Sequence, residues 1–169
     1  MFYKAISNYH ATKLTAFTQI ALDSTGIKFT ENNSQIWLLS NALAGCSDWK
    51  AYSTLFISFK LRGLRLTVVP NPSINDFDYR GTAALGYVAT ADGAFVADTL
   101  ESNKSLVLSP LQTVSCYWPL NGGTTGWTAT NTTNQMTGKL QCASSSNASS
   151  GGVVFSMRVD FYIIYKNTI

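Results

Sequence analysis

Charged residues are scarce in this chain of 169 residues, because Asp, Glu, Lys and Arg together make up 12% of it, roughly half the usual fraction. Hydrophobic residues reach 46%, so the polar remainder is mostly Ser, Thr and Asn. A surface with so little charge gains little solubility from repulsion between molecules. We therefore expect a single domain that packs readily against copies of itself.

Histidine is almost missing, since His10 is the only one in the sequence. A single histidine excludes a three-histidine metal site, and its place near the N-terminus favours a surface role over a Ser-His or Cys-His catalytic pair. No glycine-rich phosphate loop of the Walker or dinucleotide type occurs. Only Asp160 among the carboxylates lies within a clear strand pattern, which argues against a pair of glycosidase acids. The sequence therefore predicts no enzymatic chemistry.

Cysteines are few and long apolar runs are missing. Cys46, Cys116 and Cys142 form no CxxC pair, and an odd number cannot all pair within one chain. We expect buried free thiols, and a bridge between Cys116 and Cys142 is the alternative if their strands are neighbours. No run approaches the ~18 apolar residues of a membrane span, and no apolar stretch follows the first lysine. Neither secretion nor membrane insertion is predicted.

What the chain does have is the alternation of apolar and polar residues that is typical of strands. The clearest case covers 57–69, where Ile57, Phe59 and Leu61 share one face and basic residues share the other. After Gly63 the alternation slips by one residue, which is what a β-bulge produces. We therefore expect a long strand that bends at this glycine.

The C-terminal run over 153–166 alternates as cleanly, with an apolar face of Val, Phe, Met, Ile and Tyr. Its polar face carries Arg158 and Lys166 with Asp160 between them, so we expect these cations to form either intrachain ion pairs or subunit contacts. Shorter strands are expected over 35–40, 82–90, 113–118 and 137–143, a short helix over 97–109, and exposed loops over 121–135 and 144–152. Seven or eight strands with unequal loops indicate a Greek-key or jelly-roll sandwich of two sheets.

Four segments, taken in order, resemble a known family. They are CSDWKAYSTLFISFKLRGLRLTVVPNPS (46–73), GTAALGYVATADGAF (81–95), TGKLQCASSS (137–146) and GGVVFSMRVDFYIIYKN (151–167). Their order and spacing resemble the single jelly-roll coat proteins of small plant RNA viruses of the tombusvirus and sobemovirus types, and of circular single-stranded DNA viruses. The resemblance implies an all-β, eight-stranded antiparallel jelly-roll sandwich over 31–169, preceded by an N-terminal segment over 1–30 that is arm-like or partly ordered.

The same resemblance implies a structural role. A coat protein of this kind self-assembles into an icosahedral shell around a small single-stranded genome, so its expected partners are copies of itself and viral nucleic acid bound without sequence preference. Its expected location is the virion, and the host cell before assembly. A host receptor is not identified by the sequence, and no membrane partner is expected.

Genome contact is the first candidate site. Coat proteins of this kind usually begin with a basic arm, yet here only Lys4 and Lys13 precede Ile20 as fixed positive charges. Several cations on one strand can neutralise phosphates without reading bases, and Lys60, Arg62 and Arg65 share the strand that contains the bulge. The candidate nucleic-acid-binding residues are therefore Lys4, Lys13, Lys60, Arg62 and Arg65. The alternative is that these charges only keep an exposed sheet face soluble.

Two further candidate sites remain open. The resemblance implies calcium between subunits near Asp92 and Asp98, and carboxylate oxygens suit this hard cation, although both acids are also ordinary in a solvated loop. Trp118 and Trp127 flank a loop rich in Gly and Thr, and two flat aromatic rings can stack on sugars. A β-sandwich carbohydrate-binding or adhesin module is therefore the alternative function, and packing in the core or at an interface is the other explanation for these rings.

Overall fold

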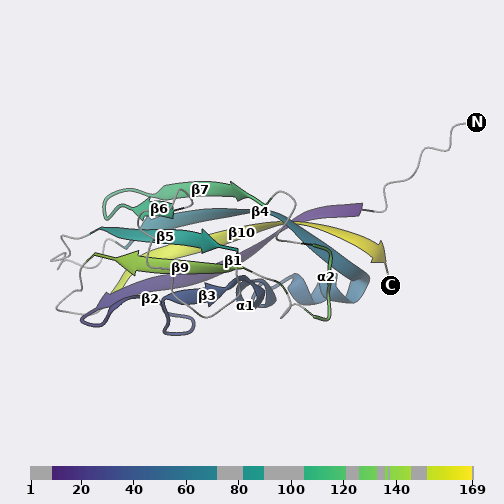
Figure 1. The fold of residues 1–169 in the computed structure, drawn as a ribbon, viewed down its shortest axis with the longest axis horizontal. Coiled ribbons are helices and arrows are strands. Elements are labelled where there is room, and N and C mark those ends of the chain that lie inside the picture. The colour runs from purple at the N-terminus through teal and green to yellow at the C-terminus, as the bar shows by residue number, and fades with distance from the viewer. Residues whose placement is uncertain are drawn as a thin grey trace, which may run out of the picture.

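The structure of the protein is a computed structural model that describes residues 9–71, 82–89, 105–120, 126–132, 136, 138–145 and 152–168. Within these residues the strands form two antiparallel sheets that pack face to face, with two short helices beside them (Figure 1). The predicted all-β sandwich is therefore confirmed.

The larger sheet has the strand order β2-β1-β10-β4-β7, and β8 pairs with β4 beyond the end of β7. Its strands are β1 (Tyr9–Asp23), β2 (Gly26–Phe29), β4 (Phe56–Pro70), β7 (Val114–Pro119), β8 (Thr128–Ala129) and β10 (Gly152–Thr168). The smaller sheet has the order β3-β9-β5-β6. Its strands are β3 (Ile36–Leu38), β5 (Ala83–Val88), β6 (Ser105–Leu108) and β9 (Lys139–Ser144). We refer to these as the six-stranded and the four-stranded sheet.

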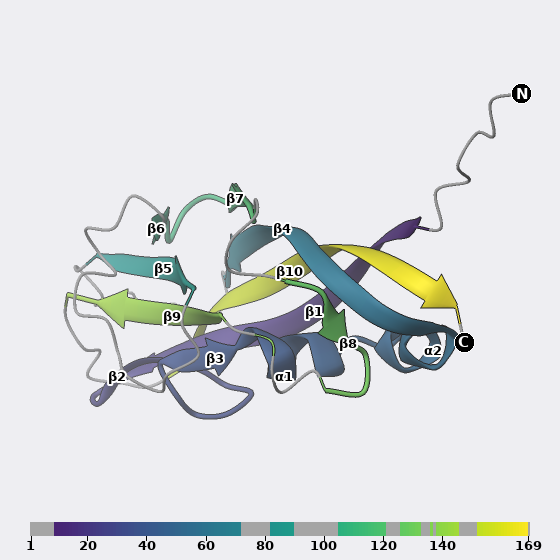
Figure 2. The same ribbon diagram turned by 45° about the vertical axis from the view of Figure 1, so that its right-hand side comes forward.

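This connectivity is that of the predicted jelly roll. Leaving aside the short strands β2 and β8, the order β1-β10-β4-β7 faces the order β3-β9-β5-β6, which makes eight strands in two sheets. The chain passes from one sheet to the other repeatedly, so the first long strand and the last become neighbours. The long strands β1, β10 and β4 run side by side through the middle of the six-stranded sheet (Figure 2).

The N-terminal segment contributes directly to the sandwich from Tyr9 onward. Strand β1 lies between β2 and β10 and pairs with both. Its inward side chains include Leu14, Ile20 and Leu22, which are each at most 2% exposed. A segment that was expected to be arm-like or partly ordered over 1–30 therefore holds two strands in its described part, because burying these side chains and pairing on both edges stabilises them.

The long strand β4 has the predicted bulge. Its pairing with β10 shifts between Tyr162 and Ile163, opposite Gly63, and the buried face changes phase there. Ile57 does not join the buried face as expected, since it is 50% exposed. Phe56 occupies the inward position instead, with its ring stacked on that of Tyr165 at 4.9 Å between centroids.

Two short helices cover the part of the long strands that the four-stranded sheet does not reach (Figure 2). They are α1 (Leu39–Ala44) and α2 (Trp49–Leu55), and neither is long and apolar enough to cross a membrane. Trp49 of α2 packs edge-on against Phe59 with 5.0 Å between ring centroids, and Tyr52 stacks on Tyr165 at 5.2 Å. These aromatic contacts extend the core past the end of the sandwich.

Two local predictions need correction in their described parts, and the remainder of both lies outside the described residues. The helix expected over 97–109 is wrong for its last part, because Ser105–Leu108 pairs with β5 as the edge strand β6. The loop expected over 121–135 contains Thr130, which is 7% exposed and donates its hydroxyl proton to the carbonyl oxygen of Phe56 at 2.7 Å. The rest of 97–109 and most of 121–135 lie outside the described residues.

The cysteines are free, as predicted, but only Cys46 and Cys142 are buried, whereas Cys116 is half-buried. Cys116 lies on β7 of the six-stranded sheet and Cys142 on β9 of the four-stranded sheet, so the alternative bridge does not form. Burial raises the pKa of Cys46, with a smaller contribution from Asp48, and also that of Cys142, in each case to about 12. Both thiols are therefore protonated at neutral pH and play a packing role.

Candidate nucleic-acid interface

The side of the six-stranded sheet turned away from the four-stranded sheet, which we call the outer face, gathers most of the basic residues that the structure describes. Alternation along β1, β4 and β10 directs their polar side chains to this face, because the apolar ones pack inward. The cations on it are Lys13, Lys60, Arg62, Arg65, Arg158 and Lys166. The carboxylates on the described parts of these three strands are Asp160, near the middle, and Asp23, which pairs with Lys28 at 3.2 Å.

The structure brings together four of the five predicted contact residues. Lys13 lies opposite Tyr162 of β10, and Tyr162 lies opposite Gly63 of β4, so Lys13 is two strand spacings, or about 10 Å, from the cations of β4. Lys60, Arg62 and Arg65 follow one another along β4 on the same face. Lys4, like the calcium candidates Asp92 and Asp98, lies outside the described residues.

Asp160 neutralises one of these cations. Its carboxylate accepts hydrogen bonds from Nε and Nη2 of Arg158 at 3.0 and 2.9 Å and from the hydroxyl of Thr15 at 2.8 Å, and the residue is 1% exposed. Burial alone raises the pKa of Asp160, but the hydrogen bonds from Arg158 and Thr15 outweigh it and hold the pKa below its ordinary value. Arg158 thus forms an intrachain pair, one of the two arrangements that the sequence predicted for it.

The cations of β1 and β4 are not neutralised in this way. Within the part of the chain that the structure describes, Lys13, Lys60, Arg62 and Arg65 form no ion pair. Arg62 and Arg65 are exposed, and Lys60 is half-buried. As far as the described residues go, their charge is therefore open to an anionic partner.

Two tyrosines flank Arg65, and we call this group the tyrosine–arginine cluster: Arg65, Tyr117 and Tyr162. The guanidinium carbon lies 6.0 Å from the centroid of each ring, and the two rings meet edge to face at 5.6 Å. Tyr117 lies across the bulge glycine, because a Cβ atom on Gly63 would be 2.3 Å from the hydroxyl oxygen of Tyr117. Gly63 therefore shapes the strand and also makes room for this ring.

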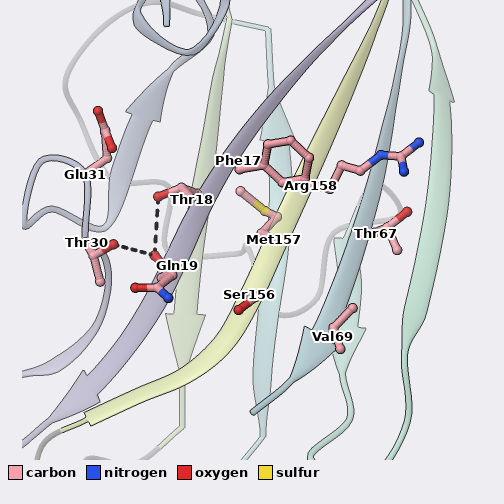
Figure 3. A pocket seen from close by; sticks show the side chains of 10 residues that line it. All are labelled: Phe17, Thr18, Gln19, Thr30, Glu31, Thr67, Val69, Ser156, Met157 and Arg158. Carbon is pink, nitrogen blue, oxygen red and sulfur yellow. Dashed lines mark hydrogen bonds between the residues drawn. The ribbon is translucent and has the colours of Figure 1, made fainter. Parts of the chain in front are cut away.

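A shallow hollow of about 540 Å³ opens on the same face (Figure 3), and its lining includes Thr67, which lies two residues along β4 from Arg65. Its wall includes Phe17 of β1 and Val69 of β4, which are 70% and 45% exposed. Arg158 lies directly opposite Phe17 on the neighbouring strand and also lines the hollow. Polar groups complete it, namely Thr18, Gln19, Thr30, Glu31, Thr67 and Ser156. No sequence pattern indicates this hollow, because its walls come from four segments of the chain.

The two tryptophans that suggested a sugar platform do not share a surface. Trp118 is 7% exposed and packs on Tyr87 with 6.2 Å between ring centroids, so it belongs to the core. Trp127 is 37% exposed, stacks on Tyr9 at 5.7 Å, and has the ammonium of Lys166 at 4.2 Å from its ring centroid. The carbohydrate-binding alternative thus loses one of its two rings.

Other chemistry finds little support among the described residues. They contain no group of three His, Cys, Asp or Glu side chains arranged to hold a metal ion. His10 lies at the start of β1, where its ring stacks on those of Phe56 and Tyr52 at 5.5 and 5.8 Å between centroids. Its position fits the surface role that the sequence predicted.

No family model and no curated protein matches this sequence, whereas solved structures match its fold. The chain is similar to the structure of Cocksfoot mottle virus with a TM-score of 0.69 and 10% identity, over 95% of this chain and 96% of that one. For tobacco necrosis virus the TM-score is 0.67 with 11% identity, over 96% and 84% of the two chains. For the capsid protein of Penaeus vannamei nodavirus in a T=1 subviral particle it is 0.60 with 10% identity, over 94% and 98%.

Proposed function

From the jelly-roll fold that this chain shares with capsid proteins of small icosahedral viruses, we propose that it is a capsid subunit, a structural protein of the virion without enzymatic activity. The observation that supports this most is the extent of the match, since 95% of this chain aligns with 96% of the Cocksfoot mottle virus chain. A match of this extent covers both sheets, whereas a match to one sheet would support the proposal much less.

Exposed apolar side chains supply contacts between copies of the subunit. Among the described residues, Leu111 is 87% exposed, Leu55 57% and Val107 56%. Large apolar side chains left in water favour association, and the low charge of the chain offers little repulsion against it. Heterologous contacts between identical subunits close into a symmetric shell when the rotation between neighbours permits.

Assembly is the direct test. We expect the purified protein at micromolar concentration and neutral pH to form uniform closed particles, visible by negative-stain electron microscopy and as one fast boundary in sedimentation velocity. The runs are repeated with calcium and with a chelator, because Asp92 and Asp98 remain predicted calcium ligands. A folded protein that sediments only as an 18.4 kDa monomer under both conditions contradicts the proposal.

The outer face of the six-stranded sheet is where we place contact with a packaged single-stranded genome. The support is the gathering of Lys13, Lys60, Arg62 and Arg65 on one face without ion-pair partners among the described residues. A shell repeats this face in every subunit, so weak attraction at each copy adds up along the strand. Binding through released counterions depends on salt and not on base sequence.

Replacing Lys60, Arg62 and Arg65 together with Gln tests this contact. Each phosphate contact on a single strand contributes about 0.7 to the slope of log affinity against log salt, so the triple variant should lower that slope by about two units and reduce packaged nucleic acid. The matched control is Lys28→Gln with Lys50→Gln, since Lys28 pairs with Asp23 and Lys50 lies on α2. Shells of the triple variant that package normally would show that these charges only keep the face soluble.

A further inference from the structure

We propose that the outer face also holds unpaired bases, which stack on Tyr117, Tyr162 and Phe17 while the neighbouring cations bind phosphates. The subunit would then prefer single strands to duplexes of equal charge. This inference rests on the proposed function, because it specifies how the same face takes up the packaged strand.

The chemical argument starts from what a single strand exposes. Every base has a flat face that stacks on an aromatic ring whatever its sequence, but a duplex hides these faces between its own base pairs. A face that carries only cations does not favour the single strand, since both forms present phosphates and the duplex has the higher charge density. Exposed aromatic side chains among cations on a sheet surface therefore favour the single strand.

The tyrosine–arginine cluster has the required arrangement. Tyr117 is 45% exposed on β7, the edge strand, and Arg65 lies 6.0 Å from its ring centroid. Tyr162 meets Tyr117 edge to face, which orients both rings in the absence of a ligand. The guanidinium of Arg65 keeps donors for a phosphate, because it forms no ion pair within the described residues. Tyr117 on β7 thus offers a ring for one base, and Arg65 on the adjacent strand β4 offers hydrogen-bond donors for its phosphate.

The hollow on the same face provides a second stacking position. The side chain of Phe17 is 70% exposed on the outer face, and Phe17 lies directly opposite Arg158 on the neighbouring strand (Figure 3). The guanidinium of Arg158 is held by its pairing with Asp160, and Arg158 and Phe17 both line the hollow (Figure 3). Arg158 and Tyr162 are four residues apart on β10, or about 13 Å, which a few nucleotides can span. The two positions therefore lie along one path across the face.

The experiment uses two fluorescently labelled probes, an unstructured strand of thymidines and a hairpin duplex with the same number of phosphates. Each probe is titrated with the full chain at several salt concentrations, and binding is measured by fluorescence anisotropy. We expect Phe17→Leu with Tyr117→Leu to bind the single strand about tenfold more weakly, with the hairpin affinity and the salt slope unchanged. The matched control is Phe17→Tyr with Tyr117→Phe, which keeps both rings and should bind like the original protein. Both positions are exposed, so thermal unfolding of all variants should coincide.

The other outcomes separate two failures. Stacking is overturned if the leucine variant binds the single strand as tightly as the original protein, or if it loses affinity for the single strand and the hairpin equally. The charge contact still stands in that case, as long as the triple Gln variant lowers the salt slope. If the original protein binds neither probe at low salt, the proposed genome contact itself fails. Fluorescence of 2-aminopurine placed in the strand gives an independent reading, because stacking quenches it: quenching that persists in the leucine variant also contradicts the proposal.

Discussion

Asp160→Asn is expected to destabilise the fold by about 2 kcal/mol at neutral pH, because it removes the negative charge from a buried group that accepts three hydrogen bonds. An amide offers a single acceptor oxygen and turns its NH₂ group toward the donors of Arg158. The effect stays below that of a fully buried ion pair, since the side chain of Arg158 is 45% exposed and water can solvate it again.

The same variant should change the dependence of stability on pH. Because the pKa of Asp160 is lower in the folded protein than its ordinary value of 3.8, its contribution is complete above that value and is lost as the pH falls through the folded pKa. The original protein should therefore lose stability below about pH 4 more steeply than the variant. Urea unfolding at neutral and acidic pH measures both effects.

Asp23→Asn is the matched control for this prediction. Asp23 also accepts hydrogen bonds from a threonine, Thr25, and pairs with a cation, Lys28, but its side chain is 35% exposed. We expect a much smaller change in stability, because water replaces the lost contacts. Equal unfolding midpoints for Asp160→Asn and the original protein would contradict the role assigned to the buried carboxylate.

Phe161→Ala is expected to destabilise the fold still more, by about 3–5 kcal/mol, because it opens a cavity at the centre of the sandwich. Phe161 is 0% exposed and lies on β10 between Leu14 of β1 and Leu64 of β4. A loss of this size is a large share of the roughly 5–15 kcal/mol that is typical of a domain. Particle formation should fall with it, since only folded subunits assemble.

The control for this cavity is Ile164→Ala on the same strand. Ile164 is half-buried on the outer face and pairs with Lys60, so its truncation leaves no enclosed cavity and should cost about 1 kcal/mol. Urea unfolding at neutral pH compares the two. Similar losses for both variants would show that β10 is not buried on one face as described.

The alternation of apolar and polar residues was strong enough to predict the strands β4 and β10 from the sequence. In β4 and β10 nearly every second residue is a large apolar one, and the phase slip at Gly63 was enough to locate the bulge. Strand β1 lacks this signal because its pattern is partly reversed, with Thr18 buried at 7% and Phe17 exposed at 70%. Helices α1 and α2, with 6 and 7 residues, are too short to show a helical period.

The candidate interface could be predicted only along one strand. Alternation places Lys60, Arg62 and Arg65 on the polar face of β4, but it says nothing of neighbouring strands. Tyr117 joins Arg65 only because the order of the sheet puts β7 next to β4, and that order depends on contacts distant in sequence. The burial of Lys139 on β9 could not be predicted either, because lysine ordinarily occupies exposed positions.

The central place of β10 also sets the order of events during synthesis on the ribosome. β10 fills the gap between β1 and β4, although about half of the chain separates it from β4 and about three quarters of the chain separates it from β1. Until β10 emerges from the exit tunnel, β1 and β4 each have an unpaired edge, and the core side chains that pack against β10 remain exposed to water. Folding of the six-stranded sheet is therefore a step of high contact order that waits for the synthesis of β10, and the nascent chain before it is the form most exposed to aggregation and to chaperones.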